Sequence, residues 1–254
     1  MDIITSKDNE MYKKIKKLKA KKYRDLEKLY LAEGRKFLEF KELPEMIIFR
    51  EGISDDVIDM AEHHICKKIM LNEKLFKELT SQESSQGVII CYKSKIKELN
   101  ELEDNIVVLN KVSDPGNLGT IIRVSDAAGF KDIILTKGSV DCYNDKTVRS
   151  SMGSILNVNI HYIEEEKLVG FLKDREYKII STALEKDSID YTKMKLQEKN
   201  AFIFGNEGDG ISKNIIANSD EKVIIPIYGG AESLNVAMAT GIILYEVRNK
   251  LNNK

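Results

Sequence analysis

The second half of the chain alternates short apolar runs with helical patterns, and this alternation limits its fold more than any other feature. The runs typical of strands cover residues 106–109, 132–135, 158–162, 177–182, 201–204 and 222–227. Strands that alternate with helices predict a mostly parallel sheet covered on both faces. Segment 233–251 repeats apolar residues at helical spacing and ends in Arg248 and Lys250, which suit a helix C-terminus. We therefore expect an α/β domain that closes with a long helix.

A smaller α/β pattern precedes this domain. Its strands are expected at 29–32, 46–49, 68–71 and 88–92, with turns at Gly34, Gly52 and Gly87. A charged and polar stretch follows and separates the two patterns. The 254 residues exceed the ~100–200 that are usual for one domain, so the length accommodates two. We expect a small domain over residues 1–95, a linker over 96–105 and a larger domain over 106–254.

Basic residues are concentrated near the N-terminus, although the formal net charge of the chain is only −1. Asp8 and Glu10 are the acidic residues of segment 7–24. Its basic residues are Lys7, Lys13, Lys14, Lys16, Lys17, Lys19, Lys21, Lys22 and Arg24. Such a block is typical of a surface that contacts phosphate. Apolar residues at helical spacing, such as Ile15 and Leu18, are equally compatible with an ordinary solvated helix.

Composition excludes several other classes of protein. No apolar run approaches the ~20 residues of a membrane span, and the first residues lack the order of a signal peptide. We therefore expect a cytoplasmic protein. Cys66, Cys91 and Cys142 are widely spaced and form no C-x-x-C pair, so we expect reduced structural cysteines and no metal site.

Three polar loops that contain glycine follow strands of the larger pattern. The first, DPGNLGTIIRVSDAAGF over residues 114–130, has a turn signal before a helical pattern. Asn117 is expected at or near the N-cap of that helix, and Arg123 lies within the next two turns. A helix N-terminus beside an arginine favours phosphate. A capped structural helix with a surface arginine is the alternative.

The second loop, residues 205–210, and the third, residues 225–235, also lie between a strand and a helical pattern. The second has the order G-x-x-G-x-G, which is not the dinucleotide fingerprint G-x-G-x-x-G. Glu207 places a carboxylate in it, and its glycines allow close approach of a ligand to the backbone. Ser233 or Asn235 can cap the terminal helix. Together, three such loops at strand ends predict a ligand site in an open α/β sheet.

The sequences NLGTIIRVSDAAGF, FIFGNEGDGIS and IPIYGGAESLNVAMATGI resemble, in order and spacing, the three motifs of the SpoU-type (TrmH-like) ribose methyltransferases of the SPOUT superfamily. The resemblance covers roughly residues 106–250 and includes segment 148–153. LYLAEGRKFLEF and SQGVII resemble the small substrate-binding domain that many of these enzymes carry. The resemblance implies a parallel sheet with a deep trefoil knot, and a homodimer with the motif-bearing helices at its interface.

The same resemblance implies an enzyme that methylates a ribose 2′-hydroxyl of RNA with S-adenosylmethionine as the methyl donor. The added N-terminal domain favours ribosomal RNA of the 23S type as substrate. The alternatives are a methyltransferase that acts on transfer RNA and an inactive relative that only binds RNA. No metal and no membrane partner are expected.

The catalytic and donor-binding roles are transferred by matching motif, whereas Lys16 and Lys17 are taken from the basic N-terminal block. The expected catalytic residues are Arg123, Asn117, Glu207, Ser233 and Asn235. The expected donor-binding residues are Ala183, Leu184, Gly205, Asn206, Gly208, Ile225, Ile227 and Leu234. The expected RNA-binding residues are Arg123, Arg149, Lys16, Lys17 and Arg35. Because a guanidinium is always charged, we expect Arg123 to clamp phosphate and to orient the attacking hydroxyl, with Asn117 as its neighbour.

Overall fold

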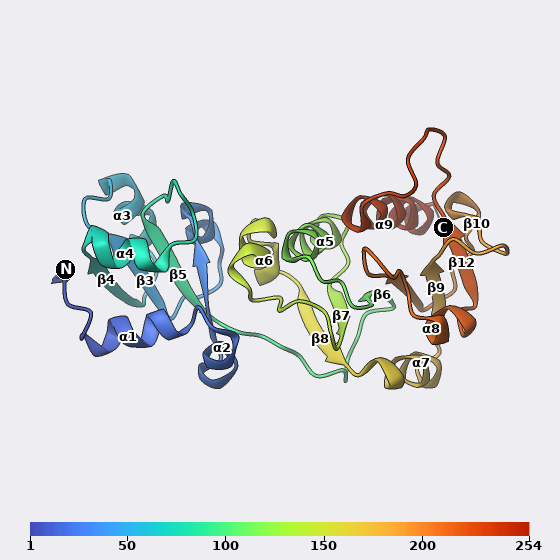
Figure 1. The fold of residues 1–254 in the computed structure, drawn as a ribbon, viewed down its shortest axis with the longest axis horizontal. Helices are drawn as coiled ribbons and strands as arrows, with labels where there is room; N and C mark the ends of the chain where they lie inside the picture. The colour runs from blue at the N-terminus through green and yellow to red at the C-terminus, as the bar shows by residue number, and fades with distance from the viewer. Residues whose placement is uncertain (254) are drawn as a thin grey trace. The chain divides into compact units, whose positions relative to one another are not determined.

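The computed structural model describes residues 1–253, which form two compact units (Figure 1). The first unit combines Met1–Lys95 with Asp141–Leu156. The second combines Ile96–Val140 with the chain from Asn157 onward. The segment Asp141–Leu156 thus belongs to the first unit, although it lies between two strands of the second in the sequence.

The first unit is built on a five-stranded sheet in the order β1-β4-β3-β5-β2. Its strands are β1 (Ile3–Ile4), β2 (Leu29–Glu33), β3 (Met46–Arg50), β4 (Lys67–Leu71) and β5 (Val88–Lys93). Its helices are α1 (Glu10–Lys17), α2 (Lys21–Glu27), η1 (Arg35–Glu39), α3 (Asp55–Glu62), α4 (Glu73–Leu79), α6 (Asp145–Ser150) and η2 (Ser154–Leu156). β5 runs antiparallel to β2 and β3, whereas β3 and β4 are parallel. The four expected strands are present, and the short β1 was not expected.

Much of the basic N-terminal block forms ion pairs within the first unit. The Glu78 carboxylate accepts hydrogen bonds from Lys16, at 2.5 Å, from Lys7 and from the Tyr12 hydroxyl. These hydrogen bonds lower the pKa of Glu78 to about 2. Tyr12 and Ile15 are the buried residues of α1. The block therefore contains an ordinary packed helix, several of whose lysines have a carboxylate partner.

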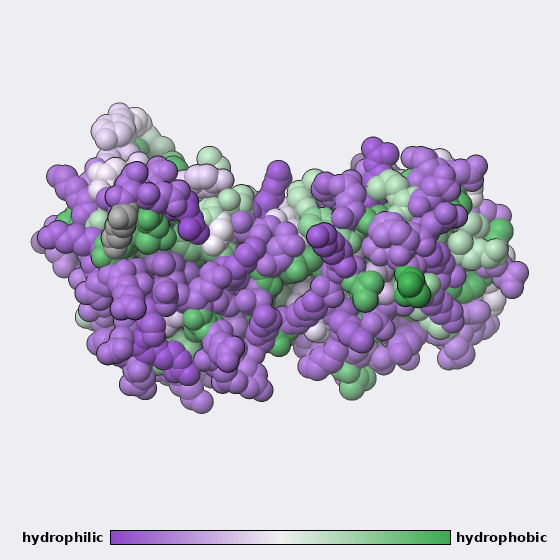
Figure 2. Space-filling view, turned by 180° about the vertical axis from the view of Figure 1, so that it is seen from behind, coloured by the Kyte–Doolittle hydropathy of each residue, from purple (hydrophilic) through white to green (hydrophobic). Residues whose placement is uncertain are grey.

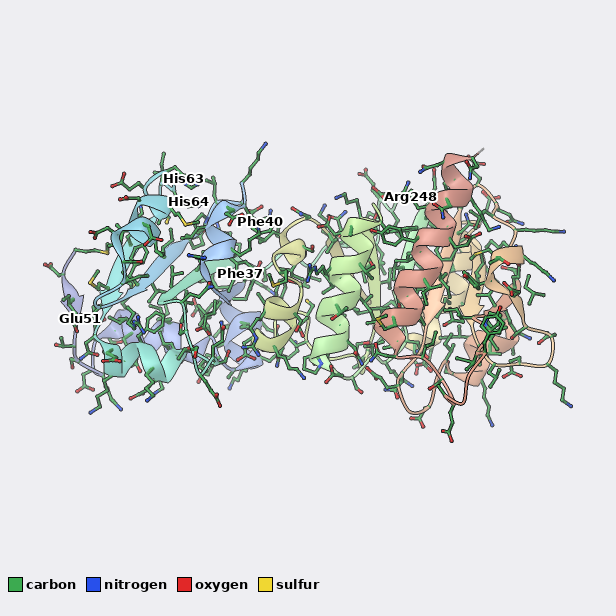
Figure 3. The ribbon with its side chains drawn as sticks, turned by 90° about the horizontal axis from the view of Figure 1, so that it is seen from above. Phe37, Phe40, Glu51, His63, His64 and Arg248 are labelled. Atoms are coloured by element: carbon green, nitrogen blue, oxygen red, sulfur yellow. The ribbon has the colours of Figure 1, made fainter. Side chains whose placement is uncertain are left out.

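Segment Asp141–Leu156 is fastened to the first unit by a buried arginine. Arg24, with 7% of its surface exposed, donates to Asp141 Oδ2 through Nε at 3.2 Å and Nη2 at 2.5 Å. Its Nη1 donates to two carbonyls of the α1–α2 turn. Tyr143 stacks on Tyr30 with 4.3 Å between ring centroids. Gly153 lies so close to the Phe40 ring, labelled in Figure 3, that a Cβ would come within 2.0 Å of it.

The second unit is built on a seven-stranded parallel sheet in the order β10-β12-β9-β11-β6-β7-β8. Its strands are β6 (Asn105–Leu109), β7 (Asp132–Thr136), β8 (Asn159–Ile163), β9 (Lys178–Thr182), β10 (Ile189–Asp190), β11 (Asn200–Phe204) and β12 (Glu221–Ile224). Its helices are α5 (Pro115–Ala127), α7 (Glu165–Asp174), η3 (Tyr191–Lys193), α8 (Lys213–Ala217) and α9 (Val236–Asn252). The expected α/β fold with a parallel sheet is confirmed.

Helices cover both faces of this sheet, as the buried strands β7 and β11 require. Leu168 and Leu172 of α7 pack with Ile215 of α8 on one face. α5 and α9 lie on the other side and pack against each other (Figure 1). Arg248, at the end of α9 (Figure 3), donates to the carbonyls of Ala128 and Gly129 after α5 at 2.8 and 2.9 Å.

The polar segment expected as a linker is tied to the second sheet by a buried pair. His161 Nε2 lies 2.8 Å from Asp132 Oδ1, and its Nδ1 faces the carbonyls of Lys97 and Glu98. Asp132 also accepts hydrogen bonds from the backbone N–H of Glu103 and from Asn159. Burial raises the pKa of Asp132, but these hydrogen bonds together lower it below its usual value.

We predict that Asp132→Asn lowers the free energy of unfolding by about 3 kcal/mol, because it leaves His161 without its buried carboxylate. Since the folded pKa of Asp132 is lowered, its contribution is complete above the unfolded pKa and is lost as pH falls through the folded pKa. Urea unfolding at several pH values measures both effects. The exposed Asp2→Asn is the control. Equal stability of the two variants at pH 7 would contradict the prediction.

Candidate functional site

Three loops of the second unit meet at one edge of its sheet. They follow β9, β11 and β12, which are neighbours and run parallel. Because the carboxyl ends of parallel neighbours lie at the same edge, the loops converge there. They line a pocket of about 460 Å³. The loop after β12 also projects outward from the unit (Figures 1 and 2).

The pocket gathers most of the residues that the motifs single out. All of the expected donor-binding residues line it, namely Ala183, Leu184, Gly205, Asn206, Gly208, Ile225, Ile227 and Leu234. Glu207, Ser233 and Asn235 line it as well. The sequence reasoning missed Thr182, Phe204, Val223, Ile224, Gly210, Glu232, Val236, Ala239 and Ile243. The helical spacing of Val236, Ala239 and Ile243 marks one face of α9 and could have indicated that this face points into the pocket.

Gly205 permits the tight turn at the centre of the pocket. A Cβ at this position would lie 2.3 Å from the Gly210 carbonyl carbon and 2.5 Å from the Ile211 nitrogen. Asn206 and Gly210 exchange backbone hydrogen bonds of 3.0 and 3.1 Å, which close the turn. The Asn206 side chain accepts from the Gly208 N–H at 2.7 Å. The loop is therefore a closed turn that presents backbone to the pocket.

Glu207 connects the loop after β11 to the loop after β6. Its Oε1 accepts a hydrogen bond from Asn117 Nδ2 at 2.8 Å, and its Oε2 accepts one from Ser113 Oγ at 3.2 Å. Partial burial raises the pKa of Glu207, but the hydrogen bond from Asn117 and those from backbone N–H groups outweigh burial and lower the pKa. Glu207 is thus a carboxylate at neutral pH, and it accepts hydrogen bonds.

Asn235 connects the loop after β12 to the loop after β6. Its Nδ2 donates to Asn117 Oδ1 at 2.9 Å, while its Oδ1 caps α9 by accepting from Ala237 N at 2.9 Å. The expected role of Asn235 as a helix cap is confirmed. The N-cap of α5 is Asp114, which accepts from Asn117 N at 2.8 Å, so Asn117 lies near the cap, as expected, in the first turn of the helix. Asn117 thus links the loops that follow β6, β11 and β12.

Arg123 lies apart from this chain of hydrogen bonds. It is exposed on α5, does not line the pocket, and forms no hydrogen bond or ion pair with the rest of residues 1–253. Arg123 lies six positions after Asn117 on α5, so the two side chains point about 120° apart around the helix. The structure therefore does not bring Arg123 and Asn117 together within one chain.

The other expected RNA-binding residues lie in the first unit. Lys16 pairs with Glu78, and the Lys17 ammonium lies 5.6 Å from the centre of the Tyr23 ring. Arg149, in α6, donates to Ser81 Oγ at 3.0 Å. Arg35 is exposed at the start of η1. None of these residues lines the pocket of the second unit.

Two further findings concern residues 1–253. No group of three or more His, Cys, Asp and Glu side chains in this range could hold a metal ion, and none of the three cysteines is in a disulfide. In the same range, no helix combines the length and the apolar character needed to cross a membrane.

Residues 104–245 match the SpoU rRNA Methylase family, and residues 9–90 match the MRM3-like substrate binding domain. The first match covers more than half of the chain, and it contains all of the residues that line the pocket. The chain therefore belongs to the SpoU rRNA methylase family, as its three motifs predicted.

Individual relatives extend this result over nearly the whole chain. The 23S rRNA (guanosine(2553)-2'-O)-methyltransferase RlmP of Bacillus subtilis is 33% identical, over 98% of this chain and 100% of its own. The tRNA (guanosine(18)-2'-O)-methyltransferase of Aquifex aeolicus is 32% identical, over 65% of this chain and 81% of its own. An AdoMet-bound rRNA methyltransferase from Sinorhizobium meliloti has a similar structure, with a TM-score of 0.86, 29% identity and 98% coverage of both chains.

We predict that Gly205→Ala closes the pocket. The added methyl meets backbone atoms of Gly210 and Ile211, and such overpacking lowers the free energy of unfolding by about 1–3 kcal/mol. Calorimetry should also detect no binding of S-adenosylmethionine. Gly230→Ala is the matched control, because a Cβ there has no atom within 4 Å. Donor binding by Gly205→Ala that equals binding by the control would refute this account of the turn.

Proposed function

We propose that this chain transfers a methyl group from S-adenosylmethionine to a ribose 2′-hydroxyl of ribosomal RNA, most specifically RNA of the 23S type. The observation that carries the proposal is the set of hydrogen bonds by which Asn117 connects two residues of the pocket lining, Glu207 and Asn235, in a SpoU-family domain. The relatives that match over nearly the full chain support rRNA as the substrate. Residues 1–95, with which Asp141–Leu156 forms one compact unit, are then the substrate-binding domain, and the rest of residues 106–254 is the methyltransferase domain.

The pocket suits the methyl donor in size and chemistry. Its volume of about 460 Å³ falls in the range of small-molecule sites, ~300–1,000 Å³. Leu184, Ile225 and Leu234 offer apolar contacts to a flat base, and the Gly205 turn offers backbone groups at close range. When bound, S-adenosylmethionine supplies an activated methyl group on a sulfonium centre. No metal is needed for that transfer.

The polar residues of the pocket position the substrate. As a carboxylate, Glu207 fixes Asn117, which in turn fixes Asn235 at the start of α9. Ser233 is exposed at the same rim and can meet the ribose. Arg123 binds an RNA phosphate and stabilises the developing alkoxide, because its charge and donors remain available. Such positioning of the reactants contributes most to the reaction rate when water is excluded from the site.

A homodimer brings Arg123 to the pocket of the partner subunit. Three observations support this assembly. Arg123 has no partner in residues 1–253, it does not line the pocket of its own chain, and α9 exposes Met238 and Tyr245 by 61% and 49%. Large exposed apolar side chains on one helix are typical of interfaces.

The C-terminal chain forms a deep trefoil knot. The sheet order supports this topology, since β12 enters between β9 and β10, two strands that precede it in the sequence. The loop from β12 then returns to Asn117 before α9 begins. As an enzyme of ribosomal RNA, the protein acts in the cytoplasm, and it has no membrane partner.

Transfer RNA is the alternative substrate, supported by the Aquifex aeolicus relative. We predict that labelled methyl from S-adenosylmethionine is transferred to unmodified 23S rRNA and not to unmodified tRNA, with a 2′-O-methyl nucleoside as product. Nuclease digestion and chromatography identify that nucleoside. Transfer to tRNA alone would select the alternative, and absence of donor binding would overturn the enzymatic assignment.

We predict that Arg123→Ala lowers kcat by about 100-fold or more while leaving the Kd for S-adenosylmethionine unchanged, because the guanidinium acts on the RNA. Arg123→Lys should restore part of the activity. Mixed dimers of Arg123→Ala and Gly205→Ala subunits should regain activity if Arg123 acts on the partner's pocket. Near-normal turnover of Arg123→Ala would reject its role, and inactive mixed dimers would reject the arrangement across subunits.

A further inference from the structure

Loop 81–87 of the first unit, with the sequence SQESSQG, connects α4 to β5 and contacts three arginines. Arg149 donates through Nη1 to Ser81 Oγ at 3.0 Å. The backbone N–H of Arg35 donates to Gln86 Oε1 at 2.9 Å. The backbone N–H of Arg50 donates to the Gly87 carbonyl at 2.8 Å, and its Nε lies 3.6 Å from the Cβ position of Gly87.

These arginines come from separate parts of the chain. Arg35 follows β2, Arg50 ends β3, and Arg149 lies in α6. The pairing registers bring them together, because Glu33 lies opposite Ile89 and Phe49 lies opposite Val88. The ends of β2 and β3 thus meet loop 81–87 at one edge of the sheet. We call Arg35, Arg50 and Arg149, with this loop, the arginine edge.

None of the three guanidiniums has a carboxylate partner within residues 1–253. Arg35 and Arg50 form no side-chain hydrogen bond or ion pair in this range, and Arg149 forms only its bond to Ser81. Five lysines of the N-terminal block differ, since Lys7, Lys13, Lys14, Lys16 and Lys21 pair with carboxylates, whereas the ammonium groups of Lys17 and Lys22 lie beside the Tyr23 ring. Unpaired arginines leave charge and donors available to a ligand.

One nearby carboxylate, that of Glu33, is used inside the loop. It accepts hydrogen bonds from Thr80 Oγ1, from Ser81 N at 3.1 Å and from Ser85 Oγ at 2.6 Å. These bonds hold the loop in shape and spread the charge of Glu33 over several donors. Ser84 and Gln86 remain exposed on the same loop. The edge thus combines fixed backbone, exposed hydroxyl and amide groups, and unpaired guanidiniums.

We propose that the arginine edge binds the phosphate backbone of the RNA substrate, in preference to the N-terminal lysine block. The inference rests on the proposed function, because it assigns the surface of the first unit that holds the RNA. Guanidiniums bind phosphate oxygens in a bidentate manner, and serine and glutamine side chains suit contacts to phosphate and ribose. Fixing the loop in advance reduces the entropy lost on binding.

The test compares triple variants of equal charge change in the full chain. Arg35→Gln, Arg50→Gln and Arg149→Gln remove the arginine edge. Lys16→Gln, Lys17→Gln and Lys22→Gln remove charge from the N-terminal block. Lys28→Gln, Lys67→Gln and Lys93→Gln remove charge at the opposite end of the strands, where Lys93 lies opposite Leu29 and Lys67 opposite Met46. The probe is unmodified 23S rRNA made by transcription, and its Kd is measured across ~50–200 mM salt, where counterion release is large.

We expect each lost phosphate contact of the arginine edge to weaken RNA binding by about fivefold to tenfold near 0.1 M salt, and to reduce the salt slope by about 0.7–0.9. The Kd for S-adenosylmethionine should not change, which verifies that the second unit is intact. The inference would be overturned if the variant at Lys28, Lys67 and Lys93 weakened RNA binding as much as the arginine-edge variant does. It would also be overturned if only the lysine-block variant lost RNA affinity. Wild-type protein that binds the donor but neither binds nor methylates rRNA would instead reject the proposed function.

Discussion

The arrangement of the site depends on the ionised carboxylate of Glu207. It accepts hydrogen bonds from Asn117 and Ser113, and through Asn117 it holds Asn235 at the first turn of α9. Loops that are about 90 to 120 residues apart in the sequence are thereby connected by side chains. A neutral side chain at position 207 would weaken these hydrogen bonds, because hydrogen bonds to a charged acceptor are stronger than those to a neutral one. The pocket therefore owes its shape to polar contacts around its rim and to the packed strands below.

Strand positions could be predicted from the sequence because β-branched and aliphatic residues cluster in runs bounded by loops. β7, β9 and β11 begin within one residue of their expected positions. The two-residue strands β1 and β10 could not be predicted, because pairs such as Ile3 and Ile4 carry no periodicity. The pocket-lining motif residues were predicted by resemblance. The partners of Asn117 were not, since a hydrogen bond between distant loops leaves no local pattern in the sequence.

Arg24 shows the same limit in the first unit. In the sequence it is one of several basic residues, yet it is buried against Asp141, and all of its nitrogens donate to oxygen atoms of the protein. Neighbouring lysines form exposed pairs, which contribute little to stability. A charge count cannot separate these cases, because burial depends on contacts with residues more than a hundred positions away. The arginines without a carboxylate partner are likewise evident only in three dimensions.

The placement of Asp141–Leu156 in the first unit has a consequence for biosynthesis. The chain passes between the units after residues 95, 140 and 156, so the units are interleaved in the order of translation. Domains generally fold as they emerge from the ribosome, the N-terminal one first. Here the first unit lacks Asp141, Tyr143 and Gly153 until residues 96–140 of the second unit have been synthesised. Arg24 must then remain without its buried partner while the strands β6 and β7 emerge, so the first unit can complete its folding only after part of the second has been synthesised.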